Sequence, residues 1–546
     1  MLINFSFKKY SKIFYQFILV FMLFKTSNIM ANLIVANNSN YTNYLNALVP
    51  GDTLYLRQGI YDNNLKLNGL NGTPLEPIVI IGEANKTIFI GQSCCNTVSI
   101  TKCSYLVIKN IKLDGQNFSI DAVKGEGTTG NWAHHITIEY LNIINYGNSQ
   151  QNVGISTKCS AWNWLIRKNT IIGAGTGMYL GNSNGDAPFV NGIIEYNYIA
   201  NTVGYNMEIK HQLNQVRNNF SGTSVDGKTI IRKNVFTKDS TSSTNGNARP
   251  NLLVGGFPLE GFGSKDYYEI YGNFFYNNPV EALFQGTGNI MLYNNIFINH
   301  YDPSGFRAIY ITPQNGVSPQ DVKIFHNTVW TLNSSGGIRL YNPNTSYQQY
   351  CYANAVFAAS PITNFSRSLD NFTNSYSNIG KYVISATTNI TQLNLYPRTG
   401  QLTGSLTLDS IFHVYTQWDK DFNEDQYQWF YRGAYSGCCI NNGWPLRLDT
   451  ITSQKTTTNI QFLKNEVDCF ILSNPINTTL YLNCDFLLPC QIEIYNSVGE
   501  KVFATPLSSP SNIIDFTNRS SGMYIISIKT KNGIFVKKIL KQEINI

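Results

Sequence analysis

The segment 204–220, GYNMEIKHQLNQVRNNF, gathers polar and charged side chains in a chain of which only 13% of residues are charged. It contributes Glu208, Lys210, His211 and Arg217, and Arg232 follows shortly after. A lysine that is desolvated and lies beside other cations has a lowered pKa and can take a proton near neutral pH. We therefore predict a catalytic site with Lys210, Arg232 and His211.

These residues lie within a repeated phrase that indicates how they are positioned. An apolar-x-x-Asn-x-apolar pattern recurs at Asn169, Asn197, Asn234, Asn273, Asn295 and Asn327, at intervals that vary as loop lengths vary. One such unit cannot bury its apolar side chains alone, whereas stacked units bury them in a continuous core and align the asparagines from coil to coil. The repeat predicts an all-β fold, a right-handed parallel β-helix of the pectate-lyase-like type. A solenoid also explains how 546 residues fold without a large spherical core.

A second strand in each coil predicts one face for substrate. Alternation along these strands points every second side chain outward. The outward set contains Glu208 and Lys210, and we expect these further residues to bind substrate: Tyr179, Arg217, Arg249, Phe284, Tyr310 and Tyr341. Glycines at 181, 255 and 286 on this face predict a groove, and exposed aromatic rings suit sugar rings.

Charged residues two positions before the repeated asparagine, or its apolar counterpart, alternate in sign. They are Lys109, Glu139, Arg167, Glu195 and Arg232. Since neighbouring coils lie about 4.8 Å apart, we expect a ladder of opposite charges on one surface of the solenoid. Arg232 is therefore both a ladder member and a catalytic candidate.

The opening coils, with ALVPGDTLYL at 47–56 and PIVIIG at 77–82, resemble those of secreted polysaccharide lyases of the chondroitinase B and alginate lyase group. The resemblance covers residues 32–365. It implies β-elimination on an acidic polysaccharide, with Lys210 as the base and Arg232 assisting the leaving oxygen. It further implies that Glu208 could ligate a calcium ion.

Two other functions remain open. A glycoside hydrolase needs two carboxylates, and Glu208 could pair with Glu260, Asp266 or Glu281. A non-catalytic adhesin or glycan-binding solenoid needs only the aromatic face. Release of unsaturated, ultraviolet-absorbing ends from polyuronates would distinguish the lyase from both.

The two ends of the chain indicate export. Lysines before the apolar run 13–24 predict a signal peptide over 1–31, with a retained anchor as the alternative. The phrases IEIYNSVGEKVF and SSGMYIISIKTKNGIFVKKILK resemble the C-terminal sorting domain of the type IX secretion system of Bacteroidetes. We expect a small β-sandwich at 466–546, after last coils and a cap at 366–450 and a linker at 451–465.

The balance of 40 Lys and Arg against 33 Asp and Glu gives a net charge of only +7, and these charges are scattered along the chain. Nucleic acid is therefore not an expected partner. We expect a secreted or outer-membrane-surface monomer whose partners are an acidic polysaccharide and the type IX secretion machinery.

Overall fold

The computed structural model describes residues 31–127, 130–217, 227–405 and 410–452, and in the C-terminal part 468–471, 476, 478–485, 490–496, 500–507, 511–530 and 533–542. The predicted signal peptide, except Ala31, lies outside these residues. So does the predicted linker, except Ile451 and Thr452.

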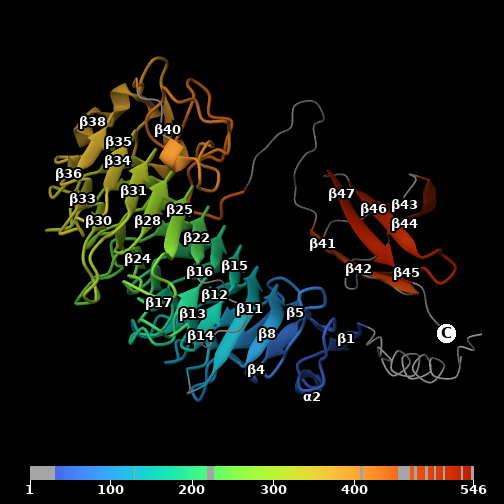
Figure 1. Ribbon diagram of the computed structural model, residues 1–546. Coiled ribbons are helices and arrows are strands. Elements are labelled where there is room, and N and C mark those ends of the chain that lie inside the picture. The colour runs from blue at the N-terminus through green and yellow to red at the C-terminus, as the bar shows by residue number, and fades with distance from the viewer. Residues whose placement is uncertain are drawn as a thin grey trace, which may run out of the picture.

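Within the described residues, the strands of 31–374 form three long parallel sheets, which we name sheets A, B and C (Figure 1). Each coil of the chain contributes strands to the sheets in turn, and each strand pairs in parallel with its counterpart one coil earlier and one coil later. The fold is therefore the predicted parallel β-helix.

Sheet C carries the predicted substrate face, and its strands are β4 (Leu65–Asn68), β7 (Val98–Thr101), β10 (Val123–Gly125), β13 (Val153–Thr157), β17 (Thr176–Leu180), β21 (Met207–Ile209), β24 (Leu252–Val254), β27 (Phe284–Gly286), β30 (Ile309–Ile311), β33 (Ile338–Leu340) and β36 (Ile362–Thr363). Sheet A contains β1 (Leu33–Ala36), β2 (Thr53–Leu56), β5 (Ile78–Gly82), β8 (Cys103–Lys109), β11 (Trp132–Glu139), β14 (Ser160–Trp162), β15 (Leu165–Arg167), β18 (Phe189–Val190), β19 (Ile193–Glu195), β22 (Lys228–Arg232), β25 (Tyr267–Tyr271), β28 (Ile290–Tyr293), β31 (Val322–Phe325), β34 (Gln349–Tyr352) and β37 (Arg367–Leu369). Sheet B contains β3 (Gly59–Tyr61), β6 (Thr87–Ile90), β9 (Lys112–Asp114), β12 (Asn142–Ile144), β16 (Thr170–Ile172), β20 (Tyr198–Ala200), β23 (Val235–Thr237), β26 (Phe274–Tyr276), β29 (Ile296–Asn299), β32 (Thr328–Thr331), β35 (Ala355–Phe357) and β38 (Phe372–Asn374).

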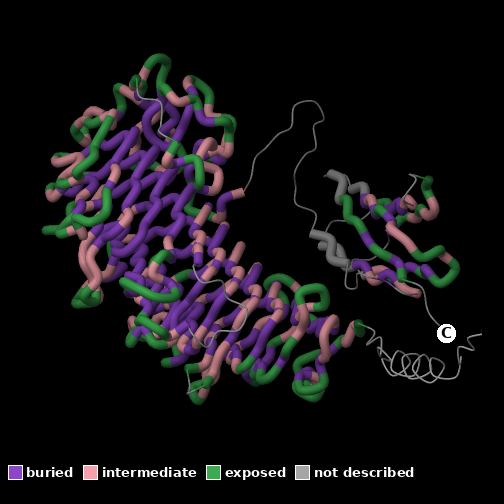
Figure 2. The backbone as a smooth tube through the Cα atoms, viewed as in Figure 1, coloured by how far each residue is buried: buried purple, intermediate pink, exposed green. Residues whose placement is uncertain are grey.

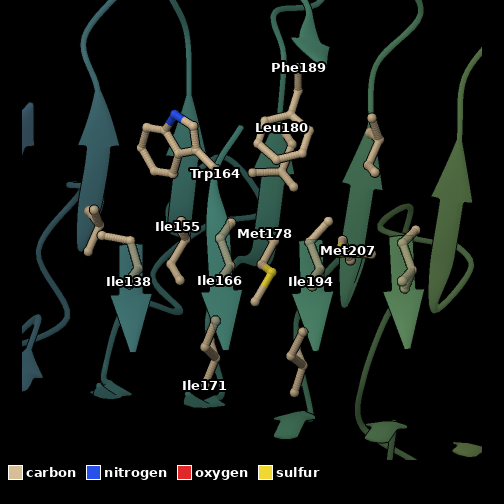
Figure 3. Close-up of a cluster of buried hydrophobic side chains, with 14 of the residues drawn as sticks. Ile138, Ile155, Trp164, Ile166, Ile171, Met178, Leu180, Phe189, Ile194 and Met207 are labelled. Carbon is tan, nitrogen blue, oxygen red and sulfur yellow. The ribbon is translucent and has the colours of Figure 1, made fainter. Parts of the chain in front are cut away.

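Apolar side chains from all three sheets fill the interior of the solenoid. Ile166 and Ile194 from sheet A, Ile171 from sheet B, and Met178 and Met207 from sheet C are all buried (Figure 3). Burial of each such side chain contributes about 1.5–3 kcal/mol. Figure 2 shows this buried interior running along the length of the coils.

The predicted asparagine ladder is confirmed. The side-chain oxygen of Asn197 accepts hydrogen bonds from the backbone and side-chain nitrogens of Asn169, at 3.1 and 2.9 Å. The same pattern runs through Asn234, Asn273, Asn295 and Asn327. It extends beyond the predicted members to Asn354 and Asn371. The ladder satisfies buried backbone groups at the turn between sheets A and B.

The predicted charge ladder is also present, on sheet A. Glu139 lies 3.7 Å from Lys109 and 2.6 Å from Arg167, and Glu195 lies 2.6 Å from Arg232. These ion pairs follow the parallel register of β8, β11, β15, β19 and β22.

After β38 the chain packs sideways against the solenoid. This segment contains η1 (Tyr376–Lys381), β39 (Val383–Ser385), η2 (Ile390–Gln392), β40 (Asn394–Pro397) and η3 (Ser410–Phe412), and a short helix, α2 (Thr42–Leu45), lies near the other end. Leu395, Tyr435 and Trp444 cover outward side chains of sheet B, and Phe412 and Tyr415 cover outward side chains of sheet A. Neither cluster includes outward side chains of sheet C.

The C-terminal part forms two antiparallel sheets with a common core. One contains β41 (Asp468–Ile471), β42 (Thr479–Asp485) and β45 (Ser511–Asp515), and the other β44 (Lys501–Leu507), β43 (Cys490–Asn496), β46 (Gly522–Thr530) and β47 (Gly533–Lys541). Leu480 and Ile514 from the first sheet pack with Ile494 and Ile526 from the second. This is the expected small β-sandwich.

Candidate functional site

The outward side chains of sheet C form a row that follows the strand register from coil to coil. We call it the central row, and it contains Ser156, Tyr179, Glu208, Leu253, Gln285, Tyr310 and Arg339. A second outward row lies two residues further along each strand and contains Lys158, Gly181, Lys210 and Gly255. Glu208, Lys210 and Tyr179 are thus brought together as the sequence predicts.

Lys210 and Glu208 form an ion pair on β21 and the residue that follows it. The Lys210 Nζ donates to a Glu208 carboxylate oxygen at 2.8 Å, and Glu208 is only 3% exposed. Burial lowers the pKa of Lys210, but the charge of Glu208 and the hydrogen bond to it outweigh burial, so the pKa is raised. Lys210 is therefore held as a cation, which contradicts the expected lowering of its pKa for a role as base.

Lys158, which is not among the residues selected from the sequence, has the opposite character. Its Nζ lies 3.2 Å from the centroid of the Tyr179 ring, and the Lys210 Nζ lies 5.6 Å from the same centroid. Burial, aided by the charges of Lys124 and Lys210, lowers the pKa of Lys158 to about 8 against the opposing effect of Asp121 and Glu208. The feature of the sequence that could have identified Lys158 is its position in the same outward row as Lys210, two coils earlier.

Tyr179 lies between the two lysines. Its ring is half-buried on β17, and its hydroxyl is hydrogen-bonded to Lys210. Burial raises the pKa of this hydroxyl, and the charge of Glu208 raises it further, so the group is protonated at neutral pH. Three groups are therefore adjacent on one surface: Lys158, which can be neutral or charged, the cation of Lys210, and the hydroxyl donor of Tyr179.

His211 follows Lys210 and contacts a loop from a distant coil. Its Nδ1 lies 2.9 Å from the side-chain nitrogen of Asn315, in the loop after β30. Burial and the charge of Lys210 lower the pKa of His211, so the ring is neutral at pH 7. The histidine fastens this loop to the end of β21.

Arg232 does not belong to the Lys210 site, which corrects the prediction. It ends β22 in sheet A, where it pairs with Glu195 and donates to the Tyr271 hydroxyl at 2.9 Å. The residue that stands one coil after Glu208 is Leu253, 45 positions later in the sequence. A separation of 22 residues carries the chain only partway around this long coil, from sheet C to sheet A.

Phe284 and Arg217 are also corrected. Phe284 is fully buried, because Gln285, not Phe284, is in register with Leu253 and faces outward. Arg217 is 3% exposed and pairs with buried Asp266, which also accepts a hydrogen bond from Gln212 at 3.2 Å. Neither side chain lies on the surface where substrate would bind.

The remaining predicted substrate-binding residues lie on or beside sheet C. Arg249 precedes β24 and lies over the Tyr205 ring at 5.6 Å, while Tyr310 and Tyr341 flank Arg339 at 5.7 and 5.1 Å. Tyr341 is 46% exposed, so its ring is available to a ligand.

The glycines that the sequence predicts to open a groove for a ligand instead make room for atoms of the protein's own neighbouring coils. A Cβ at Gly255 would lie 2.4 Å from the backbone nitrogen of His211, and a Cβ at Gly181 would lie 3.3 Å from the Cβ of Lys210. Gly181 also has φ +84°, a conformation that side chains rarely adopt. These glycines let neighbouring coils approach closely.

The described residues do not fit the calcium site that the lyase resemblance implies. Glu208 is engaged by Lys210, and the described part of the chain holds no group of three or more His, Cys, Asp or Glu residues that could bind a metal. We therefore derive no role for a metal ion.

The carboxylates considered for hydrolysis differ strongly in environment. Asp266 is committed to Arg217, and Glu260 is exposed. Glu281 is buried beside Gln285 at 2.6 Å, and burial raises its pKa to about 7. Glu281 and the ion-paired Glu208 are thus two carboxyl groups of unlike character near one face.

Comparison with known families identifies the end of the chain. Residues 471–542 match the family described as secretion system C-terminal sorting domain. The chain carries a type IX secretion sorting domain. The protein is therefore directed to the cell surface or the extracellular space. No curated protein matches the chain.

Solved structures resemble the chain at low sequence identity. An alginate lyase from Paenibacillus sp. str. FPU-7 is 15% identical, with a TM-score of 0.39, over 63% of this chain and 99% of that one. A mutant of the PL6 family alginate lyase AlyGC is 13% identical, with a TM-score of 0.42, over 82% and 61% of the two chains. The tailspike protein gp49 from Acinetobacter baumannii bacteriophage Fri1, a capsular polysaccharide depolymerase, is 10% identical, with a TM-score of 0.28, over 94% and 78%.

Among the described residues, no helix has the length and apolar character needed to span a membrane.

Proposed function

We propose that the protein acts outside the cell on an acidic polysaccharide, as a lyase that uses Lys158 as the base. The observation that carries this proposal is the placement of Lys158 over Tyr179, beside the Lys210–Glu208 ion pair, on the outward face of sheet C. Export through the sorting domain brings this face to polymers that cannot enter the cell.

The chemistry assigns each group a separate task. Neutral Lys158 takes the proton from the carbon next to the uronate carboxylate, and the electron pair of that bond forms a carbon–carbon double bond. The glycosidic carbon–oxygen bond breaks with its own electron pair, and the departing oxygen takes the proton of the Tyr179 hydroxyl. The cation of Lys210 lies where it can neutralise the carboxylate as negative charge develops, while Glu208 holds that cation in place.

This assignment differs from the sequence-based one in its base. Elimination needs a lysine that loses its proton near neutral pH, and the ion pair with Glu208 stabilises the charged form of Lys210. Lys158 combines a lowered pKa with partial exposure and proximity to a hydroxyl donor.

The test is cleavage of polyuronates by the purified chain and by Lys158→Met. We expect the native protein to release unsaturated ends that absorb in the ultraviolet, and the variant to lose at least about a hundredfold in rate. Lys66→Met is a matched control, because Lys66 is an outward lysine on β4, three coils earlier on the same sheet. Equal activity of Lys158→Met and the native chain would contradict the proposal.

A glycoside hydrolase is the second candidate, favoured by the unlike environments of Glu208 and Glu281. It would release reducing ends without ultraviolet absorbance, and Glu281→Gln would abolish that release. Binding of an acidic polysaccharide without either product would instead indicate a glycan-binding solenoid.

A further inference from the structure

A second cationic cluster lies on sheet C, several coils away from Lys158. Arg339 follows Tyr310 in the central row, and Arg307 lies just before β30. The guanidinium of Arg339 is flanked by the rings of Tyr310 and Tyr341. Burial lowers the pKa of Arg307, and the charge of Arg339 lowers it further.

Among the described residues, no carboxylate forms an ion pair with either arginine. None of the ion pairs formed within the described residues includes Arg307 or Arg339. By contrast, the lysine and arginine members of the sheet A ladder pair with Glu139 or Glu195. Two cations without an ion-pair partner among the described residues, one of them held between aromatic rings, are suited to an anionic partner that also has stacking faces.

The two cationic clusters lie in one strand register of sheet C. Five coil steps in register separate Tyr179 from Arg339, through Glu208, Leu253, Gln285 and Tyr310, which is about 24 Å at the spacing of parallel strands. Leu253 and Gln285, which lie between the clusters, are each 9% exposed. The loop after β30 runs back beside it, bonded to Thr287 at 2.9 Å through Val317 and to His211 through Asn315.

We propose that Arg339, with Arg307, Tyr310 and Tyr341, forms a distal subsite that binds an acidic sugar of the same polysaccharide chain whose cleavage Lys158 catalyses. The inference rests on the proposed function for the identity of its ligand. It adds that the substrate is a polyanionic chain long enough to lie along sheet C and contact both clusters. A short oligosaccharide reaches one cluster only, so the distal subsite strengthens binding of long chains through a second, linked contact.

The experiment measures the affinity of the full chain for polymeric alginate and for an alginate disaccharide, in the native protein and in Arg339→Ala. We expect the substitution to weaken polymer binding about tenfold and to leave disaccharide binding unchanged. The matched control is Arg367→Ala, because exposed Arg367 also lies over a tyrosine, Tyr350 at 5.6 Å, but belongs to sheet A. Equal losses in Arg339→Ala and Arg367→Ala, or no loss in Arg339→Ala, would overturn the subsite.

Thermal unfolding of each variant shows whether a loss of affinity reflects a loss of fold. Arg339→Lys provides a further measurement, since it keeps the charge and removes the planar guanidinium; we expect it to recover only part of the affinity.

Failure of the subsite is distinguishable from failure of the lyase. A native chain that binds polymer tightly through Arg339 without cleaving it contradicts the lyase alone, whereas cleavage of polymer and disaccharide unaffected by Arg339→Ala contradicts the subsite alone.

Discussion

Lys158 and Lys210 lie two coils apart in the same row of sheet C, and their pKa values are shifted in opposite directions. The difference arises from Glu208, which contacts Lys210 at 2.8 Å and acts on Lys158 only over a longer distance. Burial without a contacting counter-charge leaves Lys158 as the lysine that can be neutral near physiological pH. The two side chains are therefore matched to two different tasks.

The pH dependence of cleavage tests this difference. Because Lys158 must be unprotonated, we expect the rate to rise with pH and to approach a plateau above a midpoint near 8. The carboxylate of Glu208 raises the pKa of Lys158, so Glu208→Gln should move the midpoint to lower pH. The measurement is the pH profile of kcat/KM for both proteins. A midpoint that stays in place, or moves to higher pH, would contradict the assignment.

At the scale of single elements, the asparagine ladder determines the turn between sheets A and B. The residue before each member has a positive φ, for example Lys168 at 54° and Lys233 at 55°. This conformation turns the asparagine side chain into the solenoid, where its amide replaces the hydrogen bonds that the turning backbone lacks.

Asn273→Ala tests the contribution of one ladder position. The substitution removes the acceptor of the Asn234 backbone and side-chain nitrogens and the donor to the Ile231 carbonyl. Since each buried polar group left without a partner costs about 1–3 kcal/mol, we expect the free energy of unfolding to fall by about 3 kcal/mol or more. Urea denaturation provides the measurement, with exposed Asn63→Ala as control. A change no larger than that of the control would mean that water replaces the missing amide.

The coil arrangement was predictable because asparagine recurs at one structural position, whereas the assignments of Phe284 and Arg232 were wrong for local reasons. Leu283 and Phe284 are adjacent and both buried, so the strand does not alternate, and the register shown by the partner strands is needed to place Gln285 outward. Arg232 was assigned by distance along the chain, yet the coil from β21 to β24 is 45 residues long. The pKa difference between Lys158 and Lys210 depends on three-dimensional burial, which no spacing in the sequence reports.

At the scale of the whole molecule, the packing of the segment after β38 supports the proposal that sheet C is the face that binds substrate. The segment after β38 covers outward aromatic side chains of sheets A and B with its own apolar residues, while the central row of sheet C keeps Tyr179, Tyr310 and Arg339 partly accessible. The C-terminal β-sandwich has its own core and needs no residue of the solenoid to complete it. The proposed catalytic face and the sorting domain thus belong to parts with separate hydrophobic cores.

Separate cores predict that export can be removed without loss of the site. The outer face of β46 and β47 exposes Ile525, Val536 and Leu540, an apolar surface suited to contact with the secretion machinery. A chain that ends at residue 452 should therefore fold and cleave polyuronate after lysis, yet be absent from the surface and medium of a host with type IX secretion. Cell fractionation with external protease treatment measures location, and ultraviolet absorbance of the lysate measures activity. Surface delivery of the truncated chain would show that export does not depend on the sorting domain. If the full chain is active but the lysate of the truncated chain is not, the solenoid depends on the sandwich for its fold.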